Sequence, residues 1–215
     1  ISGHPKFPRR SIFHALNQKA IARKYAKDHN KKYEDLNLII VHLGGGVSVG
    51  VHKKGLVIDV NQALDGEGPF SPERTGSLPV NEVVNACFSG QYTKEQIKKM
   101  IVGNGGFVAY LGTNDAYTVE VKAKEGSEEH AFIQSAMAYQ VAKEIGAAAT
   151  VLNGKVDAIV LTGGIAYGKP FDEEVIERVK FIAPVEIYAG EDEMGALAMN
   201  ATMFLNKEIE CKEYK

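Results

Sequence analysis

The sequence predicts an α/β fold in which a mixed β-sheet is flanked by helices. Two runs of mainly branched apolar residues, 36–43 and 156–162, are typical of strands that are buried on both faces. A hairpin pattern follows the first run, and a long helical pattern over 127–152 separates it from the second. Strands that alternate with helices, together with a hairpin, indicate a sheet with both parallel and antiparallel pairs.

The first part of the chain has the pattern of a helix, a buried strand and a hairpin. Apolar residues recur at near-helical spacing between polar ones over 11–29, which predicts a helix. The strand 36–43 ends at three successive glycines. Valine then alternates with small or polar residues over 47–51, and a turn leads into a return strand at 56–60.

The middle of the chain begins with a long segment of irregular structure. Residues 61–79 are rich in glycine and proline and show no periodicity, and loops of that length inside a domain are usually functional or mobile. Helices are predicted at 80–88 and 93–102. A short strand is predicted at 107–112, and 113–124 is expected to be a connector that runs into a helix.

The last part alternates again between helix and strand. Ser127 followed by two glutamates is a good helix start, and the alanine-rich helix 127–152 should be central and buried. The remaining predicted elements are a strand at 156–162, a helix at 171–182, a strand at 184–188, a helix at 192–205 and a frayed polar tail at 206–215.

Composition excludes several classes of protein. The 215 residues are 45% apolar and carry a net charge of −2, so a sizeable core is possible and no basic surface for nucleic acid is indicated. Apolar runs fall far short of the roughly 20 residues that cross a bilayer, so no membrane partner is expected. Cys87 and Cys211 have no paired spacing, which indicates a reducing, cytoplasmic setting. The chain begins Ile1-Ser2 without methionine, so we expect a fragment of a longer protein.

Two glycine-rich turns after buried strands are candidate nucleotide contacts. Gly44, Gly45 and Gly46 follow the first strand, and their amides could cradle phosphate oxygens. Gly163 and Gly164 follow the second buried strand, where ligands of α/β sheets commonly bind. Taken alone, the first turn is equally consistent with a purely structural role, and the second favours one.

Charged residues and histidines near these turns suggest phosphate chemistry. Arg74 lies in the irregular segment, and its planar guanidinium could hold phosphoryl oxygens in a bidentate fashion; the alternative is a surface salt bridge. His42 and His14 could each donate an N–H to a phosphoryl oxygen, or be satisfied structural histidines. Asp192 and Glu193 precede the last helix and could contact Mg²⁺, or could simply favour the helix N-terminus.

Six segments, taken in order, resemble motifs of the acetokinase family. Among them are FHALNQKA, HLGGGVSVGVH, ALDGEGPFSPERTG and GEDEMGALAM, which are most similar to the butyrate kinase branch of the family. Thr113-Asn114-Asp115 falls at the family's SSD motif, and Thr162-Gly163-Gly164-Ile165 at its TAGIGEN motif. The resemblance covers nearly the whole chain and implies an actin-like ATPase (ribonuclease H-like) domain.

The resemblance also implies an activity and its cofactors. The whole enzyme would transfer a phosphoryl group from ATP, with Mg²⁺, to butanoate, giving ADP and butanoyl phosphate. Residues 1–215 would form the C-terminal nucleotide-binding domain, with the N-terminal domain apparently absent, and a homodimer is expected. Within enzymes, the alternatives are a kinase for propionate, acetate or another short or branched fatty acid. Outside them, the alternative is a non-catalytic actin-like nucleotide-binding module.

The family motifs assign roles to individual residues here. The implied catalytic residues are Arg74, His14 and His42; the implied nucleotide contacts are Gly44, Gly45, Gly46, Asp115, Tyr117, Gly163, Gly164 and Ile165; and the implied metal contacts are Asp192 and Glu193.

Some positions depart from the family pattern or stay open. Tyr117 replaces a family arginine, and Gly45 replaces an asparagine, so contacts there are altered. Tyr167 lies beside the second glycine turn and is a further candidate for the nucleotide. Which of Glu191, Asp192 and Glu193 approaches the metal stays open. Because Gly163 should face nucleotide, Gly163→Val is expected to weaken ADP binding while leaving the fold near native.

Overall fold

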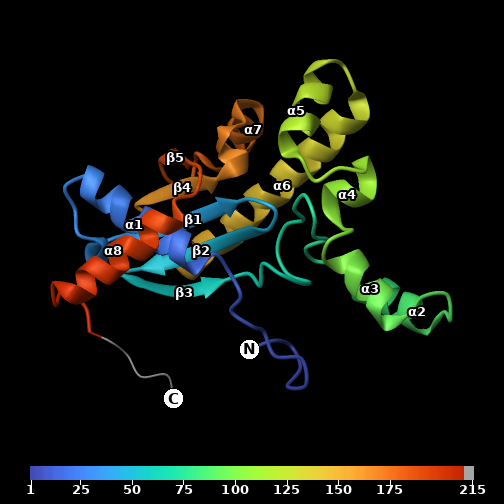
Figure 1. Cartoon of the computed structure of the whole chain (residues 1–215), viewed down its shortest axis with the longest axis horizontal. Helices are drawn as coiled ribbons and strands as arrows, with labels where there is room; N and C mark the ends of the chain where they lie inside the picture. Colours follow the sequence, from blue (N-terminus) through green and yellow to red (C-terminus); the bar gives the residue numbers. More distant parts are fainter. Residues whose placement is uncertain (211–215) are drawn as a thin grey trace.

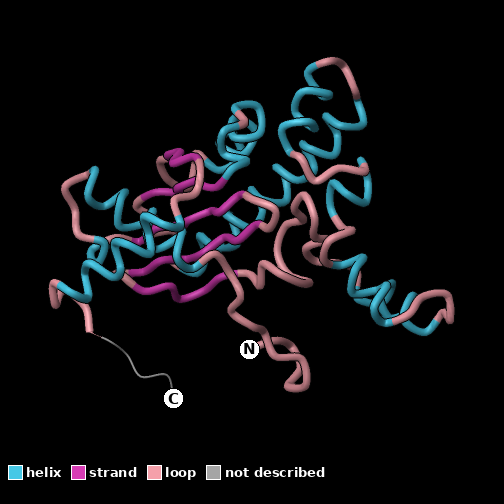
Figure 2. Tube along the Cα trace, in the orientation of Figure 1, coloured by secondary structure: helices cyan, strands magenta, loops and turns pink. Residues whose placement is uncertain are grey.

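Five strands form one mixed sheet in the computed structural model, which describes residues 1–210 apart from the side chain of Glu193. The strands lie in the order β3-β2-β1-β4-β5 (Figures 1 and 2). Their bounds are β1 Asn37–Leu43, β2 Val47–Lys53, β3 Leu56–Val60, β4 Ala158–Gly163 and β5 Val185–Ala189. β1, β4 and β5 run parallel, and β2 and β3 are antiparallel to their neighbours. The predicted α/β fold with a mixed sheet is confirmed.

Helices cover both faces of this sheet. Helices α1 (Ala15–Asp28) and α8 (Glu193–Leu205) lie on one face, and α6 (Glu128–Val151) and α7 (Lys169–Val179) lie on the other (Figure 1). Strand β1 therefore buries alternate side chains in two separate cores. Leu38 and Ile40 join the core beside α1, and Ile39 and Val41 join the core beside α6. Burial on both faces explains the continuous apolar run of β1.

The register of β1 against β4 fixes the place of the candidate site. His42 lies opposite Thr162 in the parallel pair, so the turns that follow the two strands meet at one edge of the sheet. Two short 3-10 helices lie at opposite ends of these strands: η2 (Gly164–Tyr167) follows β4 at this edge, and η1 (Tyr33–Asp35) precedes β1 at the opposite edge. Helix α5 (Ala116–Lys124) packs beside α6, and both glycine turns lie at the same edge.

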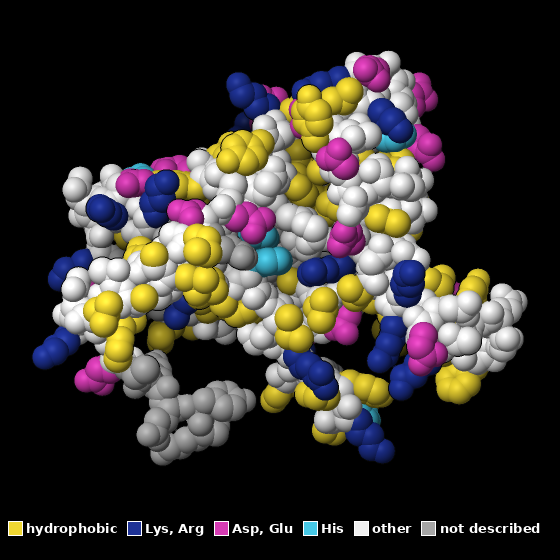
Figure 3. All heavy atoms as spheres, viewed as in Figure 1, with side chains coloured by type: hydrophobic (Ala, Val, Ile, Leu, Met, Phe, Trp, Pro, Cys, Tyr) yellow, Lys and Arg dark blue, Asp and Glu magenta, His cyan; other side chains and the backbone are white. Residues whose placement is uncertain are grey.

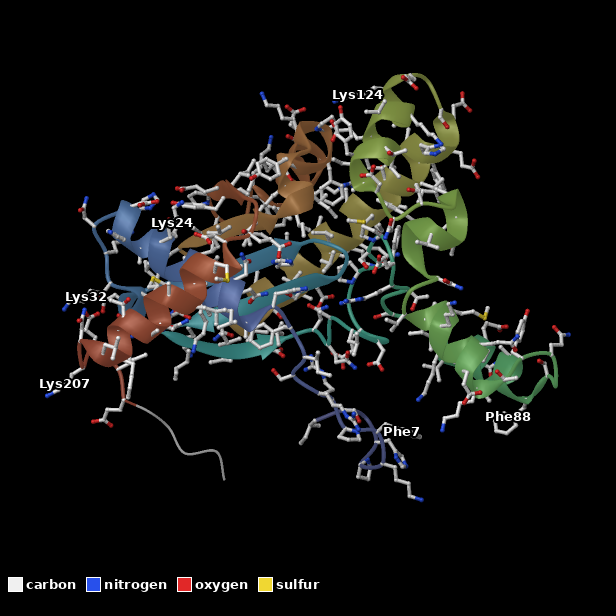
Figure 4. The ribbon with its side chains drawn as sticks, in the orientation of Figure 1. Phe7, Lys24, Lys32, Phe88, Lys124 and Lys207 are labelled. Atoms are coloured by element: carbon white, nitrogen blue, oxygen red, sulfur yellow. The ribbon has the colours of Figure 1, made fainter. Side chains whose placement is uncertain are left out.

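An arm of two helices extends from the body of the molecule. Helices α2 (Val80–Phe88) and α3 (Lys94–Ile101) contain no buried residue, and Phe88 lies near the tip (Figure 4). A capping box between Thr93 and Gln96 begins α3. At the base of the arm, the amide of Thr75 donates to the carbonyl of Ile101 at 3.1 Å, which connects the arm to the irregular segment 61–79.

Most predicted elements agree with the observed ones within a few residues, and one is wrong. Residues 107–112 were expected to form a strand, but they lie mainly in helix α4 (Gly106–Leu111). Gly112 adopts a left-handed conformation that ends this helix after six residues. The helical turn buries Phe107 against Phe70, whereas Tyr110 is exposed, so packing of one aromatic residue outweighs the strand propensity of the segment. Residues 211–215 of the predicted frayed tail, including Cys211, lie outside the described residues.

No helix in the described part of the chain is both long and apolar enough to cross a lipid bilayer.

Helix α7 buries a carboxyl group in an unfavourable setting. Asp172 is 2% exposed, and its Oδ1 atom has no hydrogen-bond partner among the described residues. Burial, and then the nearby Glu120 carboxylate, raise the pKa of Asp172 to about 7. The folded chain therefore holds this proton at pH values where the unfolded chain has released it. As pH rises from about 4 through 7, ionising this group costs folding stability.

We therefore expect Asp172→Asn to stabilise the fold, because the amide carries no charge at any pH. The free energy of unfolding in urea should rise on the order of a few kcal/mol at pH 8 and by markedly less at pH 5. Asp35→Asn, a change at an exposed carboxylate in η1, is the matched control and should have little effect at either pH. Equal stability of the Asp172→Asn and unmutated chains at pH 8 would contradict the raised pKa.

Candidate active site

The first glycine turn, residues 44–46, joins β1 to β2 at the edge of the sheet. The amide of Gly44 donates to the carbonyl of Gly46 at 3.1 Å, and the hydroxyl of Ser71 donates to the carbonyl of Gly45 at 2.6 Å. Gly45 itself is exposed. None of the three glycines has φ in the left-handed region. The turn is therefore open to a ligand without depending on strained backbone.

Arg74 packs directly against this turn. A Cβ atom at Gly46 would lie 2.0 Å from the Nη1 atom of Arg74, so glycine at this position leaves space for the guanidinium where it lies. Nη1 donates to the carbonyl of Ala63, whereas Nε is buried with no hydrogen-bond partner among the described residues. The ion pairs found among residues 1–210 do not include Arg74, so the surface salt bridge considered as an alternative is not observed there.

The long irregular segment is what carries Arg74 to the turn. The amide of Ser71 donates to the carbonyl of Arg74 at 3.0 Å, which closes a local loop. Gly76 has φ of 60°, and a Cβ there would lie 2.5 Å from the carbonyl oxygen of Gly68. Segment 61–79 thus folds tightly on itself, and this close backbone approach requires glycine at position 76.

His14 and His42 stack on each other, with ring centroids 3.7 Å apart and planes 15° from parallel. His14 immediately precedes α1, and His42 lies on β1. Nδ1 of His14 lies 2.9 Å from the hydroxyl of Ser48, and Nδ1 of His42 lies 2.9 Å from Oδ1 of Asn17. Figure 3 shows histidine atoms near the middle of this face of the molecule, with Lys or Arg atoms beside them.

Burial keeps both rings uncharged at neutral pH. Desolvation, and then the charge of Arg74, lower the pKa of His14 to about 4. Desolvation, His14 and Arg74 lower the pKa of His42 to about 3. Two neutral imidazoles add no positive charge beside the guanidinium, so repulsion between like charges is avoided. The amide oxygen of Asn17 takes the single N–H of neutral His42 at Nδ1, so His14 is the ring of this pair that can donate a hydrogen bond to an anion.

Among the acidic residues near the start of α8, Glu191 faces the first glycine turn. Its Oε1 atom lies 3.6 Å from Nε2 of His42, and a Cβ atom at Gly44 would lie 3.5 Å from the same oxygen. The carboxylate of Asp192 instead accepts the amide of Gly195 at 2.7 Å and caps α8. The side chain of Glu193 lies outside what the structure describes.

A carboxylate beside a phosphate-facing turn fits the usual binding of Mg²⁺. That ion is commonly held by one or two carboxylates together with substrate phosphates rather than by a cage of protein ligands. Consistent with this, residues 1–210 contain no group of three or more His, Cys, Asp or Glu side chains that could hold a metal by themselves. The carboxylate of Glu191 is an oxygen donor that lies beside the first glycine turn, whereas the carboxylate of Asp192 caps α8.

The second glycine turn contains one structural and one open glycine. Gly163 has φ of 93°, and a Cβ atom there would lie 2.3 Å from the carbonyl oxygen of Leu43. Gly163 is therefore required where β4 approaches β1, and the expectation that Gly163→Val preserves the fold is wrong. Gly164 is exposed, and a Cβ atom there would meet no atom within 4 Å. Ile165 is half-buried in η2 and packs against the core beside α6.

Asp115 and Tyr117 lie at the start of α5. The carboxylate of Asp115 accepts the amide of Tyr117 at 3.0 Å and the hydroxyl of Thr118 at 2.6 Å, and these bonds lower its pKa. Asp115 therefore caps the helix, which is a structural use of the group. Tyr117 and Tyr167 expose their rings, at 73% and 72%, so both rings are accessible to a ligand.

Contacts from the α5 region reach both glycine turns. The side-chain amide of Asn114 donates to Oε1 of Glu73, whose other oxygen would lie 3.7 Å from a Cβ atom at Gly45. Farther along α5, Oε2 of Glu120 would lie 2.5 Å from a Cβ atom at Gly168, which follows η2. The structure thus gathers both turns, Arg74, the histidine pair and Glu191 at one edge of the sheet.

Sequence reasoning missed two groups that touch the histidines. Ser48 is fully buried between Val47 and Val49. A hydroxyl among the valines of a strand indicates a buried polar group that needs a hydrogen-bond partner, and this could have pointed to Ser48. Asn17 is 5% exposed on α1, and an amide on the buried face of a helix was another.

Solved structures identify the class of fold. The chain superposes on acetate kinase from Porphyromonas gingivalis with a TM-score of 0.81 and 20% identity, covering 90% of this chain and 55% of that one. For propionate kinase from Francisella tularensis subsp. tularensis SCHU S4, the TM-score is 0.75 and the identity 22%, covering 86% and 53% of the two chains. The expected actin-like ATPase fold is confirmed.

Sequence comparison is more specific. The profile of the Acetokinase family matches residues 6–190. Over 214 residues the chain is 58% identical to Butyrate kinase 2 of Clostridium acetobutylicum, a match that covers 100% of this chain and 60% of that protein. The chain belongs to the acetokinase family and spans about three fifths of the length of this curated relative.

The open position of Gly164 provides a clean test of the nucleotide contact. Gly164→Val should weaken ADP binding at least about tenfold, which is ~1.4 kcal/mol, because the new side chain would occupy space next to the exposed turn. The free energy of unfolding should stay near that of the unmutated chain. Calorimetric titration with ADP measures the first quantity and urea unfolding the second.

Gly146→Val on α6 is the matched control, since its Cβ atom also meets no atom within 4 Å. It should leave ADP binding unchanged. Unmutated affinity in folded Gly164→Val would remove the second glycine turn from the binding site.

Proposed function

We propose that this chain is the C-terminal nucleotide-binding domain of a butyrate kinase. The whole enzyme transfers the terminal phosphoryl group of ATP to the carboxylate of butanoate, producing ADP and butanoyl phosphate, and the reaction is reversible. A carboxylate oxygen forms the new bond to phosphorus while the bond to the departing ADP oxygen breaks.

The observation that carries this proposal is the meeting of Arg74 and the stacked histidines at the first glycine turn. Phosphoryl transfer depends on aligning two anions and neutralising charge on the phosphoryl oxygens. A guanidinium whose Nε is buried without a partner, beside an exposed turn, is suited to such an anion. A protein that only binds nucleotide has no need of this cluster, which disfavours the non-catalytic alternative.

The choice of butanoate rests on the relative that is 58% identical, Butyrate kinase 2. The alternative acids are propionate, acetate and other short or branched fatty acids, and a propionate kinase and an acetate kinase share the fold. Because the chain spans about three fifths of its curated relative, residues outside it contribute to the choice of acid in this proposal.

Each residue of the cluster has a role that follows from its chemistry. Arg74 binds the transferring phosphoryl group and stabilises the charge that grows on its oxygens. His14, neutral because it is buried, donates a hydrogen bond to the same group without adding charge. His42 stacks on the His14 ring, and its own N–H is held by the amide oxygen of Asn17. The amides of residues 44–46 hold phosphate oxygens, and the second glycine turn with Tyr117 and Tyr167 lies against the nucleoside.

The cofactors are ATP or ADP and Mg²⁺. When bound, Mg²⁺ would neutralise phosphate charge and orient the phosphates. Glu191 is the residue that would hold it, directly or through water, since its carboxylate faces Gly44. Asp192 and Glu193, the acids implied by the resemblance, are second candidates.

The remaining parts of the proposal concern assembly and setting. The family resemblance supports a homodimer in the full-length enzyme. A reducing, cytoplasmic setting is consistent with Cys87, which is an exposed free thiol, and with the use of ATP.

Trapping of the product tests the activity. An enzyme of the full length of the curated relative, given ATP, Mg²⁺, butanoate and hydroxylamine, should form hydroxamate faster than with acetate or propionate. The 215-residue chain alone should bind ADP weakly and form none. Faster reaction with another acid would reassign the substrate, and ADP binding without hydroxamate from any acid would favour the non-catalytic module.

Arg74→Ala should lower kcat in that full-length enzyme by about a hundredfold or more, with a much smaller change in the KM for ATP. The expected loss follows from removing a group that stabilises charge in the transition state, an effect of roughly 3 kcal/mol. Arg9→Ala is the matched control, because Arg9 forms exposed ion pairs with Asp59 and Glu67. An Arg74→Ala enzyme with unaltered kcat would remove this guanidinium from the reaction.

A further inference from the structure

A continuous line of hydrogen-bonded side chains runs from η1 through the interior to the candidate active site. Gln18, Ser48 and His52 are fully buried, and Tyr33 is nearly so. In order, the contacts join Tyr33 Oη to His52 Nδ1 at 2.7 Å, His52 Nε2 to Gln18 Oε1 at 3.1 Å, Gln18 Nε2 to Ser48 Oγ at 2.8 Å and Ser48 Oγ to His14 Nδ1 at 2.9 Å.

One backbone carbonyl fixes the orientation of the amide in this line. Nε2 of Gln18 also lies 3.2 Å from the carbonyl oxygen of Ser48, which can only accept a hydrogen bond. The amide nitrogen must therefore face Ser48, and the amide oxygen must face His52. The oxygen of Gln18 then requires a proton on Nε2 of His52, which leaves Nδ1 of that ring to accept from the Tyr33 hydroxyl.

The direction of the hydrogen bonds continues to His14. Ser48 Oγ accepts one N–H of Gln18, so its own proton is free to be donated to Nδ1 of His14. A neutral His14 ring that accepts at Nδ1 carries its proton on Nε2. Nε2 is on the side of the ring opposite Ser48, and no hydrogen bond to it is found among the described residues.

The fold makes room for this line at a specific place. A Cβ atom at Gly50 on β2 would lie 2.0 Å from Oε1 of Gln18, so glycine there allows the amide to cross the strand. Burial, and then the charge of Lys19, lower the pKa of His52 to about 4. The pKa of His14 is also lowered to about 4. Both rings stay neutral at pH 7, so each has one donor and one acceptor nitrogen.

We propose that Gln18 and Ser48 are positioning residues that hold His14 in the tautomer with its proton on Nε2. The catalytic consequence rests on the function proposed above: the fixed N–H of His14 is directed toward the transferring phosphoryl group. Because the two residues are fully buried, they act on the reaction only through His14.

The first test is the tautomer itself, measured on the whole 215-residue chain with ¹⁵N-labelled histidine at pH 7. Ring nitrogen shifts should show His14 protonated at Nε2 and unprotonated at Nδ1. A proton on Nδ1 of His14, alone or together with Nε2, would overturn the proposal. This measurement needs neither turnover nor any variant.

The second test removes one link at a time. Ser48→Ala deletes the donor to His14, and its ring should become a mixture of tautomers. Tyr33→Phe is the matched control: it removes a buried hydroxyl from the far end, but Gln18 still orients His52, so the His14 signals should not move. A Ser48→Ala chain that keeps the single Nε2–H tautomer contradicts the proposal.

In the full-length enzyme, Ser48→Ala should lower kcat about tenfold to a hundredfold, the range typical when an outer partner of a functional histidine is lost, with little change in the KM for ATP. Unchanged kcat would overturn the positioning role. The tautomer of His14 is measured on the chain without turnover. A full-length enzyme that phosphorylates no acid would therefore contradict the proposed function, whereas only the nitrogen shifts of His14 decide the tautomer.

Discussion

The parallel pairing of β1 with β4 determines where the candidate site can form. Both strands end at the same edge, and Gly163 allows the end of β4 to approach the carbonyl of Leu43 more closely than any residue with a side chain could. The two glycine turns are adjacent for that reason. The remaining groups of the site, Arg74, the histidine pair and Glu191, are arranged around this contact between backbones.

Electrostatics at this edge combine a fixed charge with neutral polar groups. The guanidinium of Arg74 supplies positive charge, while burial keeps His14 and His42 neutral beside it. Protonating either ring would place two like charges in a poorly solvated space. The arrangement therefore suits an anionic ligand that brings its own negative charge, and the buried amide of Gln18 explains how a neutral histidine can still have a defined donor direction.

Much of this fold could be predicted from periodicity, because strands buried on both faces and a long alanine-rich helix have strong patterns. Residues 107–112 were assigned wrongly because the burial of Phe107, a tertiary effect, decided their conformation. Arg74, His14 and His42 were identified by residue type and motif, and the structure brings them together. The sequence predicts a ligand contact at Gly163, since a sequence cannot distinguish a glycine needed by another strand from one needed by a nucleotide. Ser48 had a sequence signal, but its contact with His14 depends on the register of β2 against β1. The choice of Glu191 among the three acids depends on the turn before α8, which the sequence does not fix.

The α2–α3 arm differs from the rest of the molecule in what holds it together. Its helices contain no buried residue, so little apolar surface is exposed when they open, whereas opening β1 exposes side chains from two cores. Amide hydrogens of the arm will therefore exchange with solvent through local opening, and those of β1 only through near-global unfolding. The hydrogen bond from the amide of Thr75 to the carbonyl of Ile101 joins the arm to the segment 61–79. Thr75, the residue next to Arg74, thus lies where a helical arm without buried residues joins the segment that carries the guanidinium.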